Sequence, residues 1–219
     1  MSDHAATVTF EPVGLRATPR ARATLIATLG LALTGIVIGA LWAWIAPPIH
    51  LVVAMTRAGE RVHDYLGAES DHFFDVPCLM LGILTVLAVV TPVLVWQWRA
   101  HRGPGMVIAV TIGMVIAAGA ASTVGAVLVR LRYGALNVDA VPLSGHPSVA
   151  YVVEAPPVFF GHGPLQVAAT LVWPAAIAAL VYAVLAAGNA RDDLGGFPPE
   201  DQQPHAPATN PEAPEAAVS

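Results

Sequence analysis

Charged residues are scarce in this chain of 219 residues, and lysine is absent altogether. Charged side chains make up 11% of the sequence, whereas a soluble domain contains about 25%. The single cysteine, Cys78, excludes an internal disulfide. What is abundant is apolar: hydrophobic residues account for 56% of the chain. They gather in long uninterrupted runs, which indicates an integral membrane protein.

Four apolar segments predict an α-helical membrane protein built as a four-span transmembrane helix bundle. We place the spans at about 24–46, 76–98, 106–129 and 164–188, within a transmembrane domain of residues 24–188. Each segment is long enough to cross roughly 30 Å of hydrocarbon as a helix. None contains a charged side chain, which argues against a proton or ion pathway made of ionisable groups.

Arginines predict the orientation of the spans. Arg16, Arg20 and Arg22 precede the first span, and Arg99 and Arg102 lie in the short turn after the second. Basic residues favour the cytoplasmic side, so we expect a plasma-membrane protein with its N- and C-termini in the cytoplasm. The polar tail 1–23 and the proline-rich tail 189–219 are expected to be disordered.

Small residues recur at four-residue spacing in three of the spans. They allow helix backbones to approach each other closely. This spacing predicts helix packing within one bundle, with dimerisation as the alternative, through Gly35, Gly39, Gly113, Ala117, Ala121 and Gly125.

Tryptophans near the span ends are predicted to lie in the membrane interface. Trp42 and Trp44 form such a pair at the end of the first span. Trp173, beside Pro174 in the last span, is expected to lie at mid-depth against another helix.

Two long outer loops, 47–75 and 130–163, are predicted to form a small extracytoplasmic β cap. The stretch "IHLVVAMTRAGERVHDYL" can be interpreted as a helix or as a hairpin that turns at Gly59. A glycine in mid-segment and a Val-Val pair favour the hairpin. Residues 148–155 predict a third strand, which Pro156 ends.

The stretch "GERVHDYLGAESDHFF" (59–74) concentrates acids and histidines in an otherwise apolar chain. Its candidate metal ligands are Glu60, His63, Asp64, Asp71 and His72. In a helix the first three would share one face, whereas in a strand His63 and Asp64 would point to opposite sides. Exposure to water between two spans explains the polarity, so we expect no metal and no other cofactor.

The segment "EAPPVFFGHGPLQ" (154–166) leads into the last span. Phe159, Phe160 and His162 are predicted to form a lip at the membrane interface. This lip either anchors the chain in the interface or contacts a lipid or a protein partner.

Several loop motifs together carry a resemblance to a known family. They are "WAWIAPPIHLVVAMTRAGERVHDYLGAESDHFF", "VWQWRAHRGPGMV", "LVRLRYGAL", "EAPPVFFGHGPLQ" and "ARDDLGGFP". The chain resembles, over roughly residues 24–198, an uncharacterised family of actinobacterial, chiefly mycobacterial, multi-pass membrane proteins that is labelled only as a domain of unknown function. The resemblance implies a plasma-membrane protein and brings no activity.

Uncharged spans and structured outer loops favour a non-enzymatic accessory or scaffold protein of the cell envelope. A small permease or a lipid- or solute-handling protein is the alternative, and a metal-dependent envelope enzyme is a third hypothesis. The expected partners are the lipid bilayer and either other envelope membrane proteins or further copies of the chain. We expect no nucleic acid.

Overall fold

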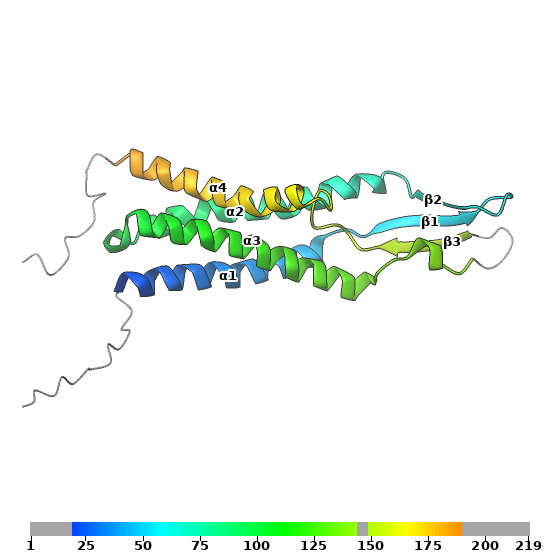
Figure 1. Ribbon diagram of the computed structural model, residues 1–219, viewed down its shortest axis with the longest axis horizontal. Coiled ribbons are helices and arrows are strands. Elements are labelled where there is room, and N and C mark those ends of the chain that lie inside the picture. The colour runs from blue at the N-terminus through cyan, green and yellow to red at the C-terminus, as the bar shows by residue number, and fades with distance from the viewer. Residues whose placement is uncertain (1–18, 144–148, 190–219) are drawn as a thin grey trace, which may run out of the picture.

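The computed structural model describes residues 19–143 and 149–189, which form four long helices and a three-stranded sheet. The helices run side by side along the long axis of the molecule, and the sheet extends from one end of them (Figure 1). All four are long and apolar enough to cross a membrane, as predicted. Their bounds are α1 Pro19–Ile45, α2 His72–Trp96, α3 Pro104–Tyr133 and α4 Pro164–Ala187.

The helix ends follow local sequence signals. Pro104 and Pro164 occupy the first helical position of α3 and α4, where a missing backbone N–H leaves no hydrogen bond unmade. Gly134 ends α3 with a φ of 77°. Helix α3 thus extends four residues past the predicted span end at 129 and includes Arg130 and Arg132. The predicted tails lie largely outside the described residues.

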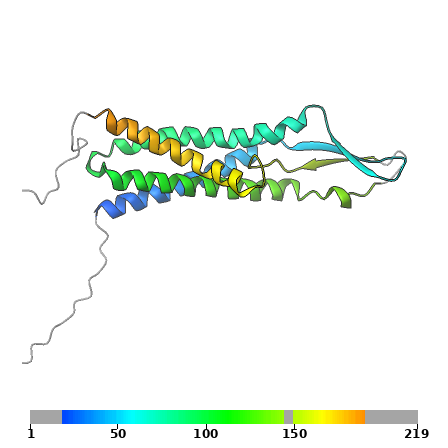
Figure 2. The ribbon, with the colours of Figure 1, turned by 45° about the horizontal axis from the view of Figure 1, so that its top comes forward.

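The helices pair in an order that differs from their order in the chain. Helix α1 packs along α3, and α4 packs against both α2 and α3, whereas α1 and α2 make few contacts. Figure 2, turned by 45°, shows the same neighbours. The short turn between α2 and α3 contains the 3-10 helix η2 (Arg99–His101).

Glycines set the closest approach between α1 and α3. A Cβ atom added at Gly35 would lie 2.3 Å from the carbonyl oxygen of Ala117, and one added at Gly39 would lie 2.4 Å from that of Ala121. These distances are below any contact that real Cβ atoms make, so the backbones touch. Of the other two glycines in the predicted set, Gly113 faces Leu31 and Gly125 faces Trp42.

Two tryptophan predictions are wrong. Trp42 is fully buried in the half of the core nearer the sheet, and its Nε1–H donates a 3.0 Å hydrogen bond to the carbonyl of Val76. Trp173 does not pack into the bundle and is 52% exposed. Trp44 is 75% exposed. The position of a tryptophan in a span predicts its depth in the membrane, but it does not predict whether the ring faces a neighbouring helix.

The sheet has the strand order β2-β1-β3 with both pairs antiparallel. Its strands are β1 (Ile49–Met55), β2 (Arg61–Tyr65) and β3 (Val149–Glu154). Between β1 and β2, Thr56 N–H donates to the carbonyl of Glu60 at 2.8 Å, and Gly59 N–H donates to that of Thr56 at 3.0 Å. Gly59 has a φ of 81°. The hairpin prediction is confirmed, and the helical alternative is wrong.

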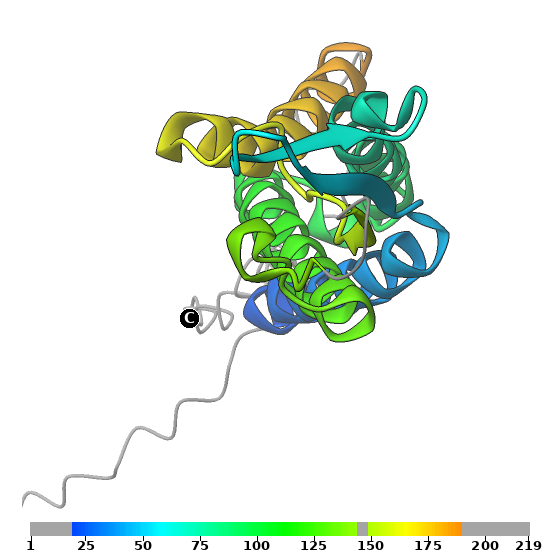
Figure 3. The ribbon, with the colours of Figure 1, turned by 90° about the vertical axis from the view of Figure 1, so that its right-hand side faces the viewer.

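One face of the sheet is covered by the segment that follows α3. Leu51 and Val53 of β1 pack with Val141, and the 3-10 helix η3 (Val138–Ala140) lies in this covering segment. Arg61 Nη1 donates hydrogen bonds to the carbonyls of Val138 at 3.1 Å and Val141 at 2.8 Å. Figure 3 views the molecule from the sheet end, so that the strands stand in front of the ends of the helices.

Candidate functional site

The first predicted ligand triplet is spread over the hairpin. Glu60 lies in the turn, and His63 and Asp64 are consecutive residues of β2. Consecutive strand residues point to opposite faces. His63 stands opposite Val53, on the face covered by the segment after α3, and Asp64 stands opposite Val52. The three side chains therefore do not converge.

The second group lies where the 3-10 helix η1 (Glu69–Asp71) leads into α2. His72 Nδ1 lies 3.1 Å from the carbonyl oxygen of Pro48, and because a carbonyl can only accept, the ring nitrogen donates its N–H. Asp71 is exposed. Glu69, which lies in the same stretch but was not a candidate ligand, accepts hydrogen bonds from the backbone N–H and the ring of His50, with a ring distance of 2.9 Å. These contacts fasten the start of β1 to the start of α2.

No group of three His, Cys, Asp or Glu side chains is placed to hold a metal ion within residues 19–143 and 149–189. His146, one of the outer histidines, lies outside the described residues. The candidate ligands Glu60, His63, Asp64, Asp71 and His72 therefore offer hydrogen bonds and surface charge in this structure rather than a shared coordination sphere.

A cavity of about 550 Å³ opens where the sheet meets the helices, and we call it the junction pocket. Its walls come from α2, the last turns of α3, the residues that follow α3, and the segment from β3 to α4. Most of the lining is apolar. Its polar side chains come from Arg130, Glu154 and His162.

The predicted lip forms one wall of the junction pocket. Phe159 packs against the core beside the sheet, and the ring of Phe160 lies 5.5 Å from the ring of Phe74. His162 also lines the pocket. Gln166 Oε1 accepts a 2.9 Å hydrogen bond from the N–H of Gly163 and so fixes the start of α4 beside the lip. Whether the lip meets lipid or a partner remains a prediction.

Glu154 places an acid at the edge of this pocket. Burial raises the pKa of Glu154 above its usual range, and the nearby His63 acts in the opposite direction. The pKa of Tyr65 is also raised, first by burial and then by the charge of Glu154. Glu154, Tyr65 and His63 thus interact on the covered face of the sheet.

The lining of the junction pocket offers groups that can bind a ligand. None of its lining residues, all within the described part of the chain, is a serine, threonine or cysteine. The pocket combines apolar walls, one arginine, one histidine and one acid whose neutral form is favoured. This combination suits an amphipathic molecule.

Sequence reasoning missed Arg130 and Glu154 as pocket residues. Arg130 directly follows the predicted third span, and Glu154 lies within the predicted strand 148–155. A signal was present: Glu154 closes a strand of otherwise uncharged residues and lies five residues before Phe159, the first residue of the lip. What the sequence could not supply is the contact between the end of α3 and the segment after β3.

Comparisons with known proteins give relatives without a known activity. A family model described as a protein of unknown function (DUF2567) matches residues 31–196. An uncharacterized protein of Mycobacterium leprae is 69% identical over 178 residues, which cover 81% of this chain and 90% of that protein. Uncharacterized proteins of Mycobacterium tuberculosis and Mycobacterium bovis are 62% identical over 192 residues, 87% of this chain and 100% of each relative. No solved structure matches significantly.

Proposed function

This chain belongs to the DUF2567 family of proteins of unknown function, and from its geometry we propose that it is a non-enzymatic accessory or scaffold protein of the cell envelope. Its four helices span the plasma membrane with both termini in the cytoplasm. The sheet lies on the outer side and presents a surface to another envelope protein.

The observation that carries this proposal is the difference between the two faces of the sheet. One face is packed against the segment after α3, and the other bears apolar side chains that the described residues leave uncovered. On that outer face Tyr151 is 75% exposed and Val62 is 46% exposed. An exposed apolar patch on a rigid support is typical of a protein–protein contact.

The support is rigid because each strand is tied to the rest of the molecule. The Arg61 side chain holds the segment after α3, the contacts between His50 and Glu69 hold β1 to α2, and β3 leads directly into the buried Val158. A partner that binds the outer face therefore meets a preformed surface and does not have to order it.

Native electrophoresis of the full chain, extracted from a mycobacterial membrane in mild detergent, tests the proposal. We expect the wild-type protein to migrate as a complex and Tyr151→Asp to shift it toward the free chain, because a buried carboxylate opposes an apolar contact. Ala58→Asp, in the exposed hairpin turn, is the matched control and should leave the complex intact. Migration of the wild type as a lone monomer would contradict the proposal.

The junction pocket favours a second function, the handling of a lipid or another amphipathic solute. Arg130 lines the pocket, whereas Arg132, also exposed and two residues away, does not. If the pocket serves transport, Arg130→Gln should fail to restore uptake or efflux to a deletion strain that Arg132→Gln restores. Unchanged uptake and efflux in the deletion strain, and in liposomes that contain the protein, would remove this function.

A further inference from the structure

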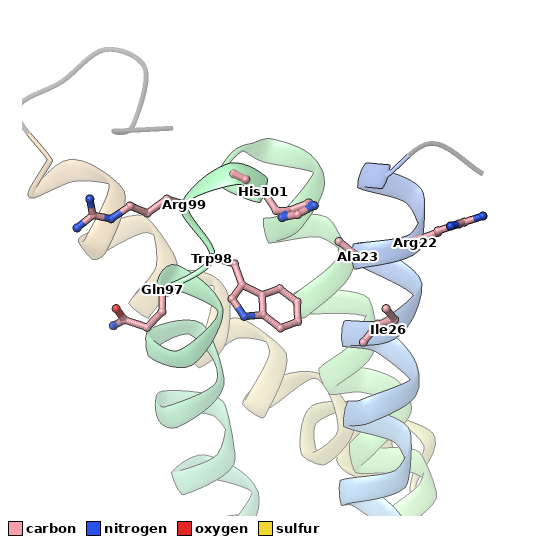
Figure 4. A pocket seen from close by; sticks show the side chains of 8 residues that line it. Arg22, Ala23, Ile26, Gln97, Trp98, Arg99 and His101 are labelled. Atoms are coloured by element: carbon pink, nitrogen blue, oxygen red, sulfur yellow. The ribbon is translucent and has the colours of Figure 1, made fainter. Parts of the chain in front are cut away.

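A groove lies between the first turns of α1 and the connection from α2 to α3, at the end of the helices opposite the sheet. Its volume is about 560 Å³, and it is lined by Arg22, Ala23 and Ile26 of α1 and by residues 97–101. Because α1 and α2 make few contacts, the residues that the structure describes do not close this gap (Figure 4).

The inside of the groove is apolar and uncovered. Ile26 is 61% exposed and Trp98 is 45% exposed. Figure 4 shows the Trp98 ring turned into the space between α2 and α1, where it faces Ile26 and Ala23. In a bilayer, the molecule able to enter such a gap from the side and cover its apolar walls is a lipid.

The rim of the groove carries positive charge. Arg22 and Arg99 extend from its two sides with their guanidinium groups pointing outward, and His101 projects toward α1 (Figure 4). At the same end Arg102 Nε donates a 2.9 Å hydrogen bond to the carbonyl of Trp96, and its guanidinium lies 4.5 Å from the centre of that ring. The arginine side chains are long enough to bring their charged ends to a phosphate at the interface.

The described part of the chain offers this end no negative charge. Within residues 19–143 and 149–189, every Asp and Glu lies in the sheet, in its connections or in the first turn of α2. None of the eight residues that line the groove is acidic. An anion from outside the described chain therefore complements this end.

Space for a polar headgroup lies directly beside the groove. A second cavity, of about 310 Å³, is lined by Thr24, His101, Arg102 and residues 103–106. His101 lines both spaces. One lipid could therefore place an acyl chain in the groove and its headgroup near the second cavity.

We propose that this groove binds one anionic phospholipid from the leaflet that surrounds it. The acyl chain lies against Ile26 and Trp98, and Arg22, Arg99 and His101 hold the phosphate. Arginine pairs with phosphate through charge-assisted hydrogen bonds, and basic pockets between spans bind anionic headgroups. The inference rests on the membrane location proposed above and concerns a site distinct from the junction pocket and the sheet.

Native mass spectrometry of the full chain tests this assignment. The detergent-purified, delipidated protein is titrated with phosphatidylglycerol or, separately, with phosphatidylcholine. We expect one phosphatidylglycerol per chain to bind more tightly than phosphatidylcholine. Near the membrane surface each arginine contributes roughly fivefold to anionic-lipid affinity, so Arg22→Gln/Arg99→Gln should weaken phosphatidylglycerol binding roughly 25-fold. Glycerol 3-phosphate at the same concentration should not displace the lipid, because it lacks the acyl chains.

The matched control removes two arginines from the other end of the molecule. Arg57→Gln/Arg132→Gln lowers the net charge equally and should leave phosphatidylglycerol affinity within about twofold of the wild type. Equal weakening by the two double variants would overturn the assignment, as would equal affinity for the two lipids. If the protein bound neither lipid, the result would contradict the proposed membrane location as well as the groove. If it bound both lipids equally, only the assignment of the groove would fail.

Discussion

Gly35 is the residue that leaves least room between α1 and α3. Its replacement by alanine would place Cβ 2.3 Å from the carbonyl oxygen of Ala117, so the helices would have to move apart. Overpacking of this kind costs about 1–3 kcal/mol. Thermal unfolding in detergent should show a lower midpoint for Gly35→Ala.

A second glycine in α1 supplies the control for that prediction. Gly30 has no atom within 4 Å of the position that its Cβ would occupy. Gly30→Ala should therefore be neutral or stabilising, because alanine is the better helix former. Equal destabilisation by both substitutions would show that close packing against α3 is not what requires Gly35.

Glu154 should make stability depend on pH. Burial raises its pKa in the folded state, so folding favours the protonated acid. This contribution is fully present below the unfolded pKa of about 4.3 and is lost as pH rises through the higher folded pKa. Glu154→Gln is neutral at every pH and should gain stability relative to the wild type between about pH 4 and pH 7.

Thermal unfolding across this pH range compares the wild type with Glu154→Gln. Glu60→Gln provides the control, because it removes a carboxylate that is exposed in the hairpin turn. Parallel pH profiles for the wild type and Glu154→Gln would mean that burial of Glu154 does not disfavour its charged form.

Among the elements, the segment after α3 depends on one side chain from the hairpin. Arg61 donates to the carbonyls of Val138 and Val141, and hydrogen bonds from a charged donor are stronger than neutral ones. Arg61→Gln should therefore loosen this segment from the sheet. Amide hydrogen exchange over residues 136–143 should be at least about tenfold faster.

The comparison for Arg61 is Arg57→Gln, two residues into the exposed turn. It removes the same charge from the same hairpin and should leave exchange over residues 136–143 unchanged. Fast exchange in both variants, or in neither, would show that the two hydrogen bonds do not hold the segment.

The elements themselves were largely predictable from the sequence, because each follows from a local signal. Apolar length gives the four helices, and Gly59 between two β-branched runs gives the hairpin. The resemblance to a mycobacterial family was confirmed as well. These features depend on a few neighbouring residues, so no knowledge of the tertiary structure is needed to find them.

Contacts between elements were less predictable. The burial of Trp42 and the exposure of Trp173 depend on which helix lies beside each ring, and alanine-rich spans look alike on every side. The junction pocket brings Arg130 and Glu154 together from segments far apart in the chain, and no local pattern records this. Gly35 and Gly39 predicted a packing face on α1, but their spacing did not predict that α3 is the helix that packs there.

At the scale of the whole molecule, the proposed orientation can be tested by cysteine accessibility. With Cys78 replaced by serine, Ala58→Cys in the hairpin turn should react with a membrane-impermeant maleimide in intact spheroplasts. Ala100→Cys, in the turn between α2 and α3, should react only after permeabilisation. Both positions are exposed, so a reversed pattern would place the sheet in the cytoplasm.

The pairing of α1 with α3 also means that α1 is synthesised well before the helix that it packs against. Roughly 60 residues separate the end of α1 from the start of α3, so at about 5–20 residues per second α1 waits several seconds for its partner to be made. Helix α2 emerges in between but offers α1 few contacts. During this interval the glycine face of the newborn α1 is open to any helix in the membrane that can approach it closely. Gly35 and Gly39 therefore allow α1 to associate with the helix of another protein until α3 has been synthesised.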